Sequence, residues 1–220
     1  MDNPSPALIE LRQVSTSLGL FPVLSGFTLT VRQGQFINLH GPTGCGKTTV
    51  LRAVAGLARP AAGSVAVGGR DLSGLSGRDI ALMRRRFGFM TREAMPPETE
   101  KLEQAVMLPA ILAGYGTDEA QELAADALSL CGLSPLASER FGALSSGARQ
   151  LALLALALVH QPVLVLADEP AANLDPEKAS LALALLSQYA RQGGTVLSVS
   201  TAPLPGSFAI EVDMEKLHHG

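Results

Sequence analysis

Apolar and polar positions alternate with a period of two in several stretches of the chain, as is typical of half-buried strands. Residues 7–14 and 27–31 follow this pattern, and Gly19, Pro22 and Gly26 lie between them. Apolar runs predict more deeply buried strands at residues 35–40, 163–168 and 195–200. Further short strands are predicted at residues 64–67, 87–90 and 208–212. Strands are thus expected in both the first and the last third of the chain.

The middle of the chain carries helical periodicity instead. Helices are predicted at residues 78–86, 101–114, 117–132, 145–160 and 176–192, with Thr117 and Ser145 as candidate N-caps. No internal repeat or low-complexity linker separates these elements. The pattern therefore predicts an α/β core interrupted by a helical insertion.

Composition narrows the possible partners and compartments. The 220 residues are 47% hydrophobic and 17% charged, with a net charge near −3, so the chain lacks the basic surface expected of a nucleic-acid-binding protein. Two cysteines are too few for a disulfide framework and fit a reducing compartment. The N-terminus lacks a signal-peptide pattern, and the longest apolar run, 151–159, is shorter than the ~20 residues that cross a bilayer. We expect a cytoplasmic chain that reaches a membrane only through another protein.

The sequence GPTGCGKT at residues 41–48 matches G-x-x-x-x-G-K-[ST] between the strand predicted at residues 35–40 and a helix predicted at residues 48–58. Its glycines let backbone N–H groups surround phosphate oxygens, and the helix N-terminus adds a positive dipole end. Lys47 is expected to reach the β- and γ-phosphates, and Thr48 to hold Mg²⁺. The predicted ATP-binding residues are Gly41, Pro42, Thr43, Gly44, Cys45, Gly46, Lys47, Thr48 and Thr49.

Two carboxylates follow the buried run VLVLA at residues 163–167. Asp168 is expected to support Mg²⁺, and Glu169 to orient or activate an attacking water as the catalytic residue. The pattern therefore favours an ATP-binding protein with the parts needed for hydrolysis.

These motifs together resemble the ATP-binding cassette (ABC) ATPases, in particular the subgroup that includes FtsE, LolD and MacB. ALSSGARQ at 143–150 is similar to the family's signature, and ADEPAANLD at 167–175 is similar to its second acidic motif and D-loop, which ends at Asp175. MRRRFGFM at 83–90 and LPAILAG at 108–114 also resemble the subgroup. The resemblance extends over nearly the whole chain.

The resemblance implies a P-loop NTPase (RecA-like) core with an antiparallel β subdomain and a helical insertion. Residues 1–220 then form a single nucleotide-binding domain, with 1–91 and 159–220 as core and β subdomain and 92–158 as helical subdomain. Two such domains are expected to face head to tail, so that Ser145, Ser146 and Gly147 contact ATP bound by the partner. A bacterial membrane permease, or an FtsX-like subunit, is expected to dock on the helical subdomain at the inner face of the membrane.

Several positions depart from the family's pattern. Arg92 stands where the family has a glutamine that senses Mg²⁺ and water, and Thr201 stands where it has a histidine that contacts the γ-phosphate. The other departures are Leu18 for the aromatic residue that stacks on adenine (with Phe21 as a possible substitute), Ser146 and Ala148 in the signature, and Leu151 and Leu156 for two arginines.

These departures bear on turnover more than on binding. A threonine hydroxyl cannot become a cation, so Thr201 cannot replace imidazole in charge stabilisation. Loss of one transition-state donor typically costs ~10²–10³ in rate, whereas Lys47, Thr48, Asp168 and Glu169 are retained. We expect ATP and Mg²⁺ binding with weak or conditional hydrolysis. The alternative is a regulatory subunit that binds ATP without turnover and pairs with a conventional ABC ATPase.

Overall fold

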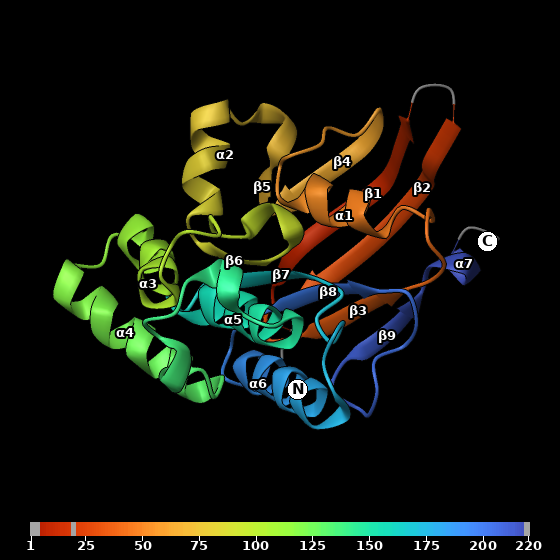
Figure 1. Cartoon of the computed structure of the whole chain (residues 1–220). Coiled ribbons are helices and arrows are strands. Elements are labelled where there is room, and N and C mark those ends of the chain that lie inside the picture. The colour runs from red at the N-terminus through yellow and green to blue at the C-terminus, as the bar shows by residue number, and fades with distance from the viewer. Residues whose placement is uncertain (1–4, 19–20, 218–220) are drawn as a thin grey trace.

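The computed structural model describes residues 5–18 and 21–217, which form two β-sheets with helices around them (Figure 1). The first sheet is antiparallel and has the strand order β2-β1-β4-β5. Its strands are β1 (Ala7–Leu18), β2 (Phe21–Arg32), β4 (Ala62–Val67) and β5 (Arg70–Asp71).

The second sheet is parallel throughout, with the order β6-β7-β8-β3-β9. Its strands are β3 (Phe36–His40), β6 (Phe87–Met90), β7 (Leu164–Asp168), β8 (Val196–Ser200) and β9 (Ile210–Asp213). Because all five strands run the same way, their carboxyl ends meet at one edge of the sheet, where α/β proteins commonly bind ligands.

Within the described residues, seven α-helices connect and cover the sheets, and Figure 1 shows how they are arranged. They are α1 (Lys47–Val54), α2 (Gly77–Arg84), α3 (Leu102–Ala113), α4 (Thr117–Leu130), α5 (Ser146–Leu158), α6 (Pro176–Arg191) and α7 (Met214–Leu217), and 3-10 turns lie at 72–74, 92–94, 134–136 and 141–143. Helix α1 contacts β4 of one sheet and β7 and β8 of the other. Helix α5 packs against β6, α3 and α4, and α6 packs against α5 and β3.

Two hydrophobic clusters hold these layers together. One joins the antiparallel sheet, α1 and one face of the parallel sheet, and includes Leu11, Leu39 and Leu166. The other joins α3 to α6 with the opposite face, and Phe141 and Leu154 are among its fully buried side chains. Gly88 of β6 permits the close approach of α5, since a Cβ there would collide with the carbonyl oxygen of Ala157.

The predicted fold class is confirmed, and most predicted elements agree with the structure to within a few residues. Two local expectations differ, and two short elements were not predicted. Strand β2 continues through Pro22 and Gly26, because it lies at the edge of its sheet, where proline is tolerated. Thr117 is the first residue of α4 and Gly116 is its N-cap, without a side-chain hydrogen bond. Strand β5 and helix α7 are too short for a periodicity signal.

No helix in the described part of the chain combines the length and the apolar character needed to cross a membrane.

Candidate functional site

The loop at residues 41–46 joins β3 to α1, at the carboxyl edge of the parallel sheet. Gly44 and Gly46 adopt φ values of 91° and 94°, a region that other residues rarely enter. A Cβ at Gly46 would lie 2.6 Å from Leu24 Cδ2, whereas one at Gly44 would meet nothing within 4 Å. The glycines thus allow both the turn and its close packing on β2.

Lys47 opens α1 and turns its side chain back into this loop. Its Nζ donates to the carbonyl oxygens of Gly41 and Pro42 at 2.6 and 2.8 Å, and the residue is only 8% exposed. A buried cation is therefore held at the centre of the loop, beside the N-terminus of α1. Both features favour an anion.

Thr48 and Asp168 approach each other from α1 and β7. The Thr48 hydroxyl donates to Asp168 Oδ2 at 3.3 Å. A hydroxyl and a carboxylate supply the oxygen ligands that Mg²⁺ prefers, and this ion usually keeps waters and phosphate oxygens as its other ligands. No group of three or more His, Cys, Asp or Glu side chains among the described residues forms a metal site. The hydroxyl of Thr48 and the carboxylate of Asp168 are oxygen groups of the kind that fit Mg²⁺.

Glu169 follows β7 in a left-handed conformation, with φ at 52°. Its peptide N–H donates to Val199 O at 2.8 Å, and Gln150 Nε2 of α5 donates to its carbonyl oxygen at 2.8 Å. A non-glycine residue in this region costs of order 1–3 kcal/mol and persists where its surroundings hold it. Gln150 is a buried polar residue that was not predicted, and its only signal was its place directly before the apolar run 151–158 of α5.

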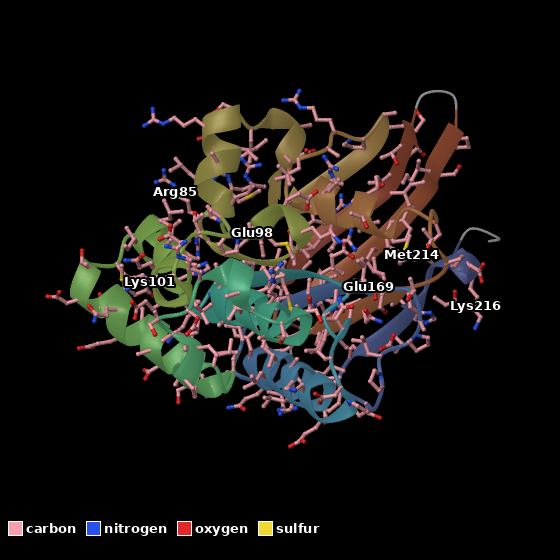
Figure 2. All side chains as sticks on the ribbon, viewed as in Figure 1. Arg85, Glu98, Lys101, Glu169, Met214 and Lys216 are labelled. Atoms are coloured by element: carbon pink, nitrogen blue, oxygen red, sulfur yellow. The ribbon has the colours of Figure 1, made fainter. Side chains whose placement is uncertain are left out.

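The pKa values of both carboxyls are raised. Burial is the main reason for Asp168, opposed by the hydrogen bond from Thr48 and the charges of Arg92 and Lys47, while Glu93 adds to the rise. Burial also raises the pKa of Glu169, and hydrogen bonds from the backbone and hydroxyl of Thr201 oppose it. The two carboxyls are thus partly desolvated neighbours, as expected at a functional site. Figure 2 shows Glu169 near the centre of the molecule.

Arg92 and Thr201 reach the same sheet edge from the strands on either side of β7. The register pairs Met90 with Ala167, and Asp168 with Val199. Arg92 begins the 3-10 turn that follows β6 after Thr91, and Thr201 is the first residue after β8. The structure therefore brings both departures from the family's pattern next to Asp168 and Glu169.

The signature residues, Ser145, Ser146 and Gly147, lie at the start of α5. Ser145 caps α5, because its Oγ accepts from Ala148 N at 3.2 Å. A Cβ on Gly147 would lie 3.3 Å from Asn173 O, so the start of α5 rests on the loop before Asp175. Asp175 caps α6 through Lys178 N at 2.9 Å. Within the described residues no hydrogen bond or ion pair joins Ser145, Ser146 or Gly147 to the phosphate loop.

The structure places two of the other departures from the family's pattern, Leu151 and Leu156, but not the side chain of Leu18. Leu151 and Leu156 are 4% and 8% exposed, so they belong to the hydrophobic core. Leu18 and Phe21 pair at the ends of β1 and β2, but their side chains lie outside the described residues.

A buried polar network beneath the loop was not predicted. Asn38 Nδ2 donates to Ser200 Oγ at 2.9 Å and to Glu211 Oε2 at 2.7 Å, and Ser198 Oγ donates to Asn38 Oδ1 at 2.8 Å. The network joins the strands β3, β8 and β9 just before their carboxyl ends. Pairing between distant strands creates it, and a single-strand pattern cannot reveal that pairing.

Comparison with known proteins gives one family match. The family model described as "ABC transporter" matches residues 24–172. The chain is 36% identical over 170 residues to the lipoprotein-releasing system ATP-binding protein LolD of Bacteroides thetaiotaomicron, covering 76% of this chain and 78% of the relative.

Two longer relatives match over part of their length. The methionine import ATP-binding protein MetN of Mesorhizobium japonicum is 35% identical over 90% of this chain, which spans only 54% of that protein. The macrolide export ATP-binding/permease protein MacB of Nitrosomonas europaea is 35% identical over 89% of this chain, which spans 30% of it.

Solved structures show the same architecture. The dimeric structure of MJ0796, a bacterial ABC transporter cassette according to its description, superposes with a TM-score of 0.87 at 25% identity and covers 94% of both chains. A second structure of MJ0796, described as a dimeric post-hydrolysis state bound to ADP and Pi, gives a TM-score of 0.81 at 25% identity and covers 88% of both chains.

Proposed function

Because this chain belongs to the ABC transporter family, we propose that it is the ATP-binding subunit of a bacterial transporter or of an FtsEX-like membrane complex. The observation that carries this proposal is the convergence of Lys47, Thr48 and Asp168 at one edge of the parallel sheet. A buried cation, a helix N-terminus and a hydroxyl–carboxylate pair are what a nucleoside triphosphate with Mg²⁺ requires.

The loop Gly41–Thr49 binds the ATP phosphates, with Lys47 as the cation. Thr48 and Asp168 hold Mg²⁺, which neutralises phosphate charge when it is bound. Glu169 orients the attacking water, and its backbone hydrogen bonds to Val199 and Gln150 keep its carboxyl at the sheet edge.

A second nucleotide-binding domain completes the site in this proposal. The start of α5, at Ser145, Ser146 and Gly147, presents backbone N–H groups and a helix N-terminus that can receive a γ-phosphate bound by the partner. The related MJ0796 cassette is described as dimeric with ADP and Pi, which supports this arrangement. Asp175, at the start of α6, lies in the loop that supports Gly147.

We assign the membrane contact to the helical part of the chain. Residues 92–158 form a helical subdomain, and residues 1–91 and 159–220 form the core and β subdomain of one nucleotide-binding domain. Helix α3 exposes Leu108, Ile111 and Leu112 by 52%, 39% and 51%, an apolar surface of the kind that marks a protein interface. A permease or FtsX-like partner on this surface would keep the chain at the inner face of the membrane.

Hydrolysis is weak or partner-dependent in this proposal, because Thr201 cannot supply a cation beside Glu169. The alternative is a regulatory subunit that binds ATP without turnover beside a conventional ABC ATPase. Copurification distinguishes them: the alternative requires a heterodimer with much more ATPase activity than this chain alone. Equal activity from the homodimer would exclude it.

The proposal is tested by the equilibrium dissociation constant for MgATP. We expect Lys47→Ala to weaken binding by on the order of 10- to 100-fold, since it removes charge-assisted hydrogen bonds to phosphate. Lys216→Ala, an exposed lysine of α7 near the C-terminal end (Figure 2), should leave binding unchanged. Absence of MgATP binding by the unaltered chain would contradict the proposal.

A further inference from the structure

The basic residues of the chain are concentrated in one segment. The whole chain has 17 basic and 20 acidic residues, but residues 52–92 contain eight arginines and only two acidic residues, Asp71 and Asp79. A protein that is acidic overall thus carries a strongly positive segment, and helix α2 lies within it. A charge asymmetry of this kind is typical of proteins that contact an anionic surface.

Helix α2 turns part of this charge outward along one face. Arg78, Leu82 and Arg85 are spaced by four and three residues, so they lie on the same side of the helix, and all three are exposed. Leu82 is 46% exposed although it is a large apolar residue. Ile80 is buried and packs on the end of α1, because a Cβ at Gly56 would lie 2.7 Å from its Cγ2. The outward face of α2 therefore presents an apolar side chain between two cations.

Two further arginines extend this face into a larger surface. Arg70 of β5 and Arg86 are exposed, and they line the same cleft as Leu82. Asp79, the acidic side chain whose pKa the charge of Arg70 helps to lower, is engaged by Ser76 in the capping box of α2. We call this the α2 basic surface, which consists of Arg70, Arg78, Leu82, Arg85 and Arg86. Within the described residues none of its four arginines forms an ion pair, so its positive charge is available to a partner.

We propose that the α2 basic surface binds the headgroups of anionic membrane lipids. Guanidinium groups donate hydrogen bonds to phosphate oxygens, and basic residues are attracted to an anionic leaflet. Apolar residues of helices that lie on a membrane enter the boundary between headgroups and acyl chains, and Leu82 is exposed in the position to do so. The proposed function brings the chain to the membrane through a partner on α3, whereas this contact is made by the chain itself.

Flotation with lipid vesicles tests the proposal on the purified chain. Vesicles of phosphatidylcholine alone are compared with vesicles of equal amounts of phosphatidylcholine and phosphatidylglycerol. The unaltered chain should bind the anionic vesicles on the order of tenfold more strongly or better, and this preference should be lost as salt is raised. The net charge of the chain is −3, so its overall charge cannot produce this preference. Leu82→Ser should weaken binding to the anionic vesicles at low and at high salt, because it removes the apolar part of the contact.

Charge reversals at matched arginines locate the contact. Arg85→Glu should weaken binding to the anionic vesicles on the order of tenfold, and Arg78→Glu together with Arg85→Glu should reduce it to the level of phosphatidylcholine vesicles. Arg140 provides the control, because it is exposed, lies outside residues 52–92 and forms no ion pair in the described part of the chain. Arg140→Glu makes the same change in net charge and should alter binding less than about twofold.

The outcomes separate this proposal from the proposed function. If the unaltered chain shows no preference for anionic vesicles, or if Arg85→Glu and Arg140→Glu weaken binding equally, the α2 basic surface is not a lipid contact. Figure 2 shows Arg85 at the outer side of the molecule, away from Glu169, so Arg85→Glu should leave the MgATP dissociation constant unchanged. An unaltered chain that binds anionic vesicles but not MgATP would support the lipid contact and contradict the proposed function.

Discussion

At the scale of single residues, the candidate site combines backbone strain with buried charge. Glu169 has a positive φ, and burial raises the pKa values of both Asp168 and Glu169. Neither feature favours folding, because strain and desolvated carboxylates both cost free energy. Both are explained if the edge is shaped for a ligand that brings its own cation.

Replacing Asp168 tests this interpretation through stability. A carboxyl whose pKa is higher in the folded state destabilises the protein once it ionises, so its cost appears as pH rises above the ordinary carboxyl value of 3.8. Asp168→Asn should therefore raise the thermal midpoint at pH 7, with EDTA and without nucleotide. The gain should shrink towards pH 3. The control is Asp126→Asn, on the exposed side of α4, which should change the thermal midpoint little. A lower thermal midpoint for Asp168→Asn than for the unaltered chain at pH 7 would contradict the interpretation.

The two cysteines should differ in reactivity. Burial raises the pKa of the Cys131 thiol to about 12, so little thiolate forms there, whereas Cys45 is partly exposed in the phosphate loop. Titration with a thiol-specific reagent at pH 8 should modify one thiol in the native protein and two after unfolding. Cys45→Ser should abolish the native reaction, and MgATP should slow it in the unaltered chain. Rapid modification of two thiols in the native protein would contradict the burial of Cys131.

The phosphate loop could be predicted from the sequence because its chemistry is local: glycines, Lys47 and Thr48 lie within one turn and the start of one helix. Gln150 and Asn38 could not be predicted in this way. Their partners, Glu169 for the first and Ser198, Ser200 and Glu211 for the second, come from distant parts of the chain. Their roles depend on strand order, which a single sequence does not reveal.

At the scale of elements, β8 is the central strand of the site. It lies between β3, which leads into the phosphate loop, and β7, which ends at Asp168. Its apolar run was recognisable in the sequence, but its place between these two strands was not. Gly41 N donates to Ser200 O at 3.3 Å, which ties the start of the phosphate loop to the end of β8.

The buried network of Asn38 should stabilise this junction. Asn38→Ala leaves Ser198 and Ser200 without their amide partner, and we expect the free energy of unfolding to fall by about 1–3 kcal/mol. Denaturant unfolding measures the effect. Ser129→Ala, at an exposed position of α4, should stay within about 0.5 kcal/mol of the unaltered chain. A similarly small change for Asn38→Ala would show that the network adds no stability.

Helix starts show why element boundaries are harder to predict than element types. Ser145 was expected to cap α5 and does so, because its side chain meets Ala148 N. Thr117 has the same kind of side chain, but α4 begins at Thr117 itself and Gly116 takes the cap position. Both serine and threonine suit caps, and the preceding glycine, which adopts the extended cap conformation, shifts the boundary by one residue.

At the scale of the whole molecule, the chain has the architecture of an ABC cassette. The two regions that we propose as halves of a nucleotide site lie in separate places. The phosphate loop lies at the carboxyl edge of the parallel sheet, and the capped start of α5 rests on the loop before α6. Two copies placed head to tail would bring one half of each together. We propose that ATP drives this closure and that its slow hydrolysis leaves the closed form long-lived.

Sedimentation velocity of the unaltered chain with MgATP and with MgADP tests this claim most directly. We expect a dimer with MgATP, a monomer with MgADP, and a monomer with either nucleotide for Lys47→Ala, because that variant loses the cation of the phosphate loop. Glu169→Gln should give the same MgATP dimer as the unaltered chain. An unaltered chain that stays monomeric and rapidly consumes ATP, while only Glu169→Gln forms the dimer, would contradict the account.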